Sequence, residues 1–142
     1  MTKLITPLRH FTRRENGAVA IEFVLLAPLL FGLLFGIVVI GYAMALSHSV
    51  QQLAGSSARA SVAGITTDER RELAQAYLDN ASANYPLLVQ SSIAPTVAVA
   101  SSPSANIRVD VRYAIDGSIV DLASGILGIE MTHLEGSAYL AY

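Results

Sequence analysis

The longest apolar run of the chain extends from Phe23 to Leu46, which is 24 residues without a charged side chain. A helix crosses a bilayer core of about 30 Å with roughly 20 such residues. The apolar stretch of a cleaved secretory signal is shorter, about 7–15 residues. The pattern therefore predicts one membrane-spanning helix.

Small and apolar residues continue beyond this run at spacings of three and four, the period of one helix face. They are Val50, Leu53, Ala54, Ser57, Ala58, Ser61 and Val62. The membrane helix is therefore expected to continue past the bilayer and to present a narrow face to a small domain. Gly64 is its predicted end, because glycine tolerates the left-handed geometry common after helices.

A second helix is predicted to begin after Thr66. Thr66 and Glu69, three residues apart, have the spacing of a capping box. The helix should end before Pro86, because the residue before a proline avoids helical geometry. Its expected apolar face consists of Leu73, Ala76, Tyr77 and Ala81.

Alternating apolar and polar residues predict strands in the remaining third of the chain. The clearest is "NIRVDVRYAID", residues 106–116, whose polar face carries Arg108, Asp110 and Arg112 as an expected row of ion pairs. Residues 95–101 and 128–142 are two further candidates, and Gly136 is expected to mark a bulge. Residues 118–128 are apolar and broken by glycine, which indicates a long connection with a short helical turn.

Together these elements predict an α+β fold. A long amino-terminal membrane-spanning helix is followed by a small outer domain with a second helix and a roughly three-stranded antiparallel sheet. The expected divisions are 1–17 as a leader, 18–64 as the transmembrane and protruding helix, and 65–142 as the outer domain.

Charge predicts the orientation of the helix. Residues 1–16 carry four Lys or Arg and one Glu, whereas residues 47–142 carry five Arg and nine Asp or Glu. Basic residues stay on the cytoplasmic side of a first membrane helix. The amino terminus is therefore expected in the cytoplasm and residues 47–142 outside it. The acidic balance argues against a nucleic-acid partner.

Catalysis finds little support in the residues. The chain has no Cys and three His that are far apart, so it offers no thiolate and no helical zinc pair. It also lacks the Gly-x-Ser-x-Gly elbow and a phosphate-binding loop. We expect no catalytic residue, metal, cofactor or small-molecule substrate.

Glu22 is the unusual residue of the apolar region, because it lies directly before the charge-free run and five residues after Gly17. It has two interpretations. The first places it, solvated and inert, at the headgroup boundary. In the second, the chain is cut after Gly17, so that Ala18 gains a free α-amino group and Glu22 lies inside the apolar stretch. A carboxylate at mid-helix costs about 2.5–3.5 kcal/mol, so it is expected to need a partner.

Two further features lie in the predicted span. Pro28 removes a backbone donor and is expected to loosen that turn, although membrane helices tolerate proline. Gly32 and Gly36 form a "GLLFG" pattern that can let two helices approach closely, although such a pattern also arises by chance in an apolar run.

The segment "RRENGAVAIEFVLLAPLL" resembles a type IV prepilin, and more closely the TadE-like minor pseudopilins of the Tad (Flp) tight-adherence pilus system. The resemblance covers residues 13–61. It implies cleavage by a prepilin peptidase between Gly17 and Ala18, and a role of Glu22 and Phe23 in assembly. The family often has tyrosine at the position of Phe23. Many members also have a second acid late in the helix, where this chain has only apolar residues, 37–40.

The resemblance implies a minor pseudopilin that acts in assembly of an adhesive pilus. Its expected partners are the prepilin peptidase, other pilins or pseudopilins, the inner-membrane pilus platform and membrane lipid. Its expected location is the bacterial inner membrane, as a single-pass protein with a periplasmic carboxy-terminal domain, or the pilus at the cell surface. The alternative is an unprocessed single-span protein that displays a small binding or scaffold domain.

Overall fold

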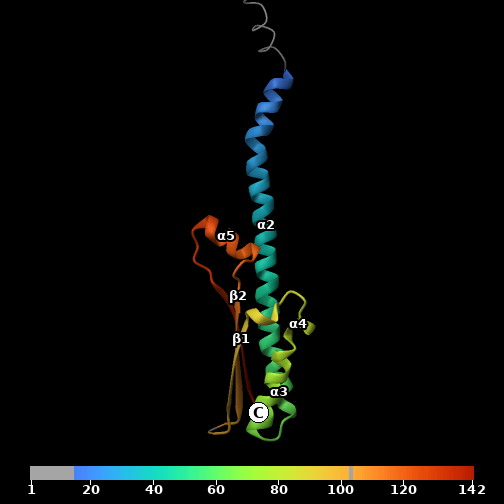
Figure 1. Ribbon diagram of the computed structural model, residues 1–142, viewed down its shortest axis with the longest axis vertical. Helices are drawn as coiled ribbons and strands as arrows, with labels where there is room; N and C mark the ends of the chain where they lie inside the picture. Colours follow the sequence, from blue (N-terminus) through green and yellow to red (C-terminus); the bar gives the residue numbers. More distant parts are fainter. Residues whose placement is uncertain (1–14, 103) are drawn as a thin grey trace, which may run out of the picture. The chain divides into compact units, whose positions relative to one another are not determined.

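The computed structural model describes residues 15–102 and 104–142, and the side chains from residue 19 onward (Figure 1). Contacts between residues divide the chain into two compact units, Met1–Val38 and Val39–Tyr142. Helix α2 (Glu15–Ala60) begins in the first unit, and its residues 39–60 belong to the second.

The first unit contains the amino-terminal part of α2. None of residues 19–38 is buried, and their large apolar side chains are exposed. The described residues contain one helical segment long and apolar enough to cross a membrane, Val19–Ala63, and only 6% of its most apolar window is buried. This agrees with the predicted single membrane helix. Pro28 lies within α2 and does not end it.

The second unit is built on a three-stranded antiparallel sheet of order β1-β2-β3. The strands are β1 (Ile93–Ala100), β2 (Asn106–Ala114) and β3 (His133–Ala141). The α+β class and the three-stranded sheet are thereby confirmed. The short 3-10 helix η2 (Gln90–Ser92) leads directly into β1.

One face of the sheet and residues 39–60 of α2 form the core. On β2 the apolar members of the predicted alternation are buried, and they pair with the apolar residues of both neighbours, as in Val97↔Val109↔Ala138. The predicted helix face is buried from Val50 through Ser61, whereas Val62, in the 3-10 turn η1 (Ser61–Ala63), is exposed. The other buried core side chains are Leu46, Ala74, Leu78, Ala81, Leu88, Ile115 and Val120.

Two glycines have roles that differ from the predicted ones. Gly136 forms no bulge, because it pairs in regular register with Val111. A Cβ there would lie 2.8 Å from the backbone C and O atoms of Val50, so glycine lets α2 pack directly against β3. Gly64 is not left-handed, with φ −76° and ψ 142°. A Cβ at Gly64 would lie 2.7 Å from the Arg70 backbone N, so close packing rather than backbone geometry requires glycine.

Helix α3 (Thr67–Asp79) begins with the predicted capping box and ends before Pro86, followed by the short α4 (Ala81–Asn84). Its predicted apolar face is wrong except at Ala81, because Leu73 and Ala76 are exposed and Tyr77 is half-buried, while Ala74 and Leu78 are buried. The small side chain of Ala74 lets α3 approach α2, where the Ser57 hydroxyl donates to the Ala74 carbonyl at 3.0 Å. The apolar residues of α3 fall almost consecutively between positions 73 and 78, so periodicity alone did not identify the buried face.

Residues 118–128 form more structure than the predicted short turn. Helix α5 (Ile119–Leu127) begins at Ser118, whose hydroxyl accepts from the Asp121 backbone N–H at 3.2 Å. It ends at Gly128, which has the left-handed φ of 68°. Both ends of the helix therefore have local capping residues, Ser118 at the start and Gly128 at the end.

Candidate functional site

The predicted processing positions lie at the start of α2. Gly17 and Ala18 are helical, whereas residues 1–14 of the predicted leader lie outside the described residues. The Glu22 and Phe23 side chains are both exposed on the helix. Residues 18 and 22 are four apart, so they share a helix face and lie about 6 Å apart along the axis.

The sequence places no cation near Glu22 on the same helix. The next charged residue along the chain is Arg59, 37 positions later. This separation corresponds to about 55 Å along a helix, far beyond an ion pair. Any cation that pairs with Glu22 must therefore come from the region before residue 18, from a new terminal amine or from another molecule.

The predicted helix-packing positions are open. A Cβ built on Gly32 or Gly36 meets no atom within 4 Å, and α2 continues through Pro28. Gly32 and Gly36 are four apart and therefore share one face. The helix surface at these glycines leaves room for the close approach of another helix.

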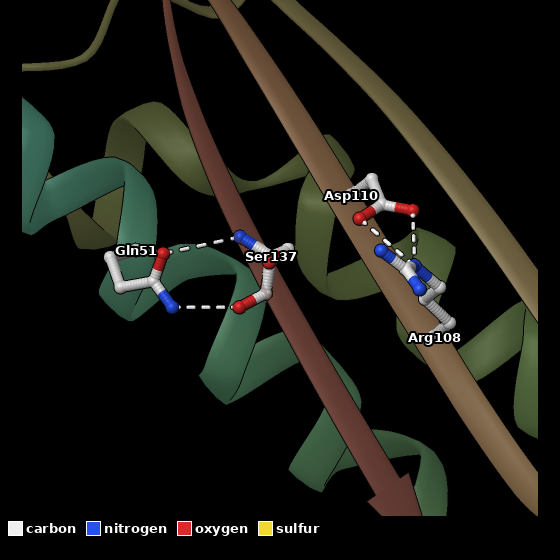
Figure 2. A network of polar contacts seen from close by, with 4 residues as sticks. All are labelled: Gln51, Arg108, Asp110 and Ser137. Carbon is white, nitrogen blue, oxygen red and sulfur yellow. Dashed lines mark hydrogen bonds and ion pairs between the residues drawn. The ribbon is translucent and has the colours of Figure 1, made fainter.

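A second set of polar residues lies on the outer face of the sheet, away from the core. Arg108 pairs with Asp110 at 3.0 Å (Figure 2), but Arg112 does not continue the predicted row. Its Nε lies 2.8 Å from Glu135, which is its direct cross-strand partner in the register. His133 Nε2 lies 3.2 Å from the same carboxylate. These side chains are exposed, and such pairs contribute about 0–1 kcal/mol each.

Gln51 joins α2 to the edge strand β3. Its Nε2 donates to the Ser137 carbonyl at 2.7 Å, and the Ser137 backbone N–H donates to its Oε1 at 3.1 Å (Figure 2). The side-chain amide thus satisfies both backbone groups of one residue, as a neighbouring strand would. The two residues are 86 positions apart, so no local pattern could have shown the contact.

The outer sheet face is hollowed beside Gln51. The hollow measures about 620 Å³, and its polar lining includes Gln51, Thr96, Arg108, Asp110, Arg112 and Glu135. Its charged residues are already engaged with one another. Among residues 15–102 and 104–142, no group of three His, Cys, Asp or Glu could hold a metal ion. The hollow therefore offers polar contacts, and its charged side chains are paired within the sheet.

The pKa shifts of the second unit have structural causes. Burial raises the pKa of Tyr85, whose hydroxyl donates to Ser56 at 3.2 Å. Backbone N–H groups of Ile65 and Thr66 lower the pKa of Glu69 in the capping box. Neither residue lies at the start of α2 or lines the hollow.

The comparisons with known proteins concern α2. Residues 17–59 match the family model described as TadE-like protein. No curated protein and no solved structure matches the chain. The match covers nearly all of α2 and begins at Gly17. Over residues 17–59 the chain is therefore TadE-like, which confirms the resemblance seen in its sequence.

Proposed function

We propose that this protein is a minor pseudopilin that acts in assembly of a Tad/Flp-type adhesive pilus after a prepilin peptidase has cut it between Gly17 and Ala18. The observation that carries the proposal is the TadE-like match, which begins at Gly17 and includes Glu22 five residues later. A plain membrane anchor has no evident need for a carboxylate at that place.

The cut explains the position of Glu22. Ala18 would carry a free α-amino group at the start of the apolar helix, and Glu22 would lie one turn inside it. Two opposite unit charges at 4 Å attract by about 4 kcal/mol at an effective dielectric of 20. The amine of a neighbouring subunit therefore offsets the cost of the carboxylate, so the charge favours the assembled state over the single subunit.

The exposure of α2 supports an assembly role. Residues 19–38 have no buried side chain, and the surface at Gly32 and Gly36 is open. Such a helix can contact lipid before assembly and other pilin helices afterward. The partners are the prepilin peptidase, other pilins or pseudopilins and the inner-membrane pilus platform.

The folded second unit favours a minor role. Major pilins of the resembled system are much shorter, whereas residues 39–142 form a unit with their own core. We place the protein in the bacterial inner membrane, with its carboxy-terminal unit in the periplasm or carried into the pilus.

The amino-terminal residue of the protein isolated from membranes tests the proposal. Edman degradation or intact-mass analysis should find Ala18 first. Gly17→Leu should block the cut, because a side chain at the cleavage position hinders close approach of the protease to the backbone. Gly41→Ala is the matched control, since a Cβ there meets no atom within 4 Å.

A mature protein that retains the residues before Gly17 in a cell with an active prepilin peptidase would overturn the pseudopilin proposal. It would favour the alternative of an unprocessed single-span protein that displays a small binding or scaffold domain outside the membrane.

A further inference from the structure

Helix α5 and the residues after it expose an apolar surface that the core does not use. We call Leu122, Ile126, Leu127 and Ile129 the α5 tip. Their exposed fractions are 62%, 79%, 70% and 53%, whereas Val120, Ala123 and Ser124 face the interior. A contiguous exposed apolar surface marks a place where a protein, a ligand or a membrane binds. The α5 tip is therefore a candidate binding surface.

The course of β2 shows where α5 lies along α2. The start of β2 is near the carboxyl end of α2, and three contacts show this. The Tyr142 backbone N–H donates to the carbonyl of Ala105, the residue before β2. Arg70 stacks on the Tyr142 ring, and its Nε donates to the carbonyl of Gly64, just beyond α2. Val111, farther along β2, pairs with Gly136, which touches the backbone of Val50. The strand thus runs from Gly64 toward lower residue numbers of α2.

Four more strand residues, from Val111 to Ile115, span about 13 Å, which equals about nine residues of a helix. Ile115 therefore lies near the level of Gly41, and α5 begins four residues later. The exposed fractions of α2 residues near Gly41 agree with this placement of α5. Val39 is 8% exposed although Ile40 beside it is 62% exposed, and Tyr42 and Ala43 pack against the cluster that contains Val120.

Residues 39–46 of α2, at this level, are the last part of the charge-free run that ends at Leu46. Tyr42 lies among them, and tyrosine is enriched at the boundary between membrane and water. The segment 117–132 contains no Lys or Arg, and its acids are Asp121 and Glu130. Asp121 accepts the Gly117 N–H at 2.9 Å, so it is engaged within the loop.

From these observations we infer that the α5 tip inserts into the headgroup and acyl boundary of the same bilayer that α2 crosses. An apolar helix face lying in this boundary is buried about 5–10 Å deep and binds through its apolar area. The lack of basic residues means that anionic lipid contributes no attraction. The inference requires only that α2 spans a membrane and is independent of pilus assembly.

Single-cysteine labelling tests the inference, because the natural chain has no cysteine. Full-length Ile126→Cys carries an environment-sensitive fluorophore in phosphatidylcholine vesicles that contain lipid-borne quenchers. Leu34→Cys, within the span, is the positive control. Ser101→Cys, in the exposed loop after β1, is the negative control at the opposite end of the unit. Quenching at Ile126 should be several-fold stronger than at Ser101 and strongest for quenchers near the headgroups.

A second substitution strengthens the test. Ile129→Asp in the same chain should reduce quenching at Ile126→Cys several-fold and leave quenching at Leu34→Cys unchanged. If the fluorophore at position 126 is quenched no more than the one at position 101 while the one at position 34 is quenched, the inference is wrong. Quenching at position 34 would still support a membrane-spanning α2. Protection of Ile126 that depends on protein concentration rather than on lipid would instead identify a second copy as the occupant and overturn it.

Discussion

Glu22 is the residue at which the assembly proposal can be tested without changing the size of a side chain. Glu22→Gln should leave cleavage and membrane insertion intact and lower crosslinking to neighbouring pilins about tenfold, a loss of about 1.4 kcal/mol out of an attraction of about 4 kcal/mol. The amino-terminal sequence, the membrane fraction and the crosslinked yield check this together. Crosslinking at the wild-type level with normal abundance would show that Glu22 is an inert residue at the headgroup boundary.

Gly136 is the residue at which packing between helix and sheet can be tested. In Gly136→Ala the added carbon would lie 2.8 Å from Val50 backbone atoms, which no rotamer change can relieve. Overpacking of this kind costs about 1–3 kcal/mol. Denaturant unfolding of the full chain in detergent should show this loss. Gly125→Ala, where a Cβ meets nothing within 4 Å, should not destabilise the protein.

At the scale of the element, the cap of α3 links stability to pH. The carboxylate of Glu69 accepts from the Ile65 and Thr66 backbone N–H groups at 2.8 and 3.2 Å, and these bonds lower its pKa from the usual 4.5. A lowered pKa in the folded state means that the stabilisation is fully present above the unfolded value. It is lost as the pH falls through the folded value.

Glu69→Gln should therefore be less stable than the wild type at neutral pH, and the difference should shrink as the pH falls below 4.5. Unfolding curves at a series of pH values measure this change. Glu72→Gln, exposed on the same helix, is the matched control. A difference between Glu69→Gln and wild type that stays constant down to acid pH would show that the carboxylate charge is unimportant for the cap.

At the scale of the whole molecule, orientation in the membrane is the testable property. Four Lys or Arg precede the apolar run and the region after it is net acidic, so residues 47–142 should lie outside the cytoplasm. In spheroplasts, a membrane-impermeant thiol reagent should label exposed Asn84→Cys, whereas Thr2→Cys in the unprocessed Gly17→Leu chain should react only after permeabilisation. Labelling in the reverse pattern would contradict the predicted orientation.

The sequence alone determined the elements whose signals are local. Three patterns each predict the element in which they occur. They are the charge-free run, the strict alternation over Ile107–Tyr113 and the spacing of Thr66 and Glu69. The membrane helix, the central strand and the capping box were therefore predictable, as was the TadE-like segment around Gly17 and Glu22.

Tertiary structure alone decided the contacts between distant segments. It selected Ala74 and Leu78 as the buried face of α3, required glycine at positions 64 and 136 because another backbone lies against them, and brought Gln51 to Ser137 across 86 residues. It also left the α5 tip uncovered. The physical reason is that side-chain periodicity reports how an element alternates between faces, whereas close backbone approach and unfilled apolar surface depend on which elements the folded chain places together.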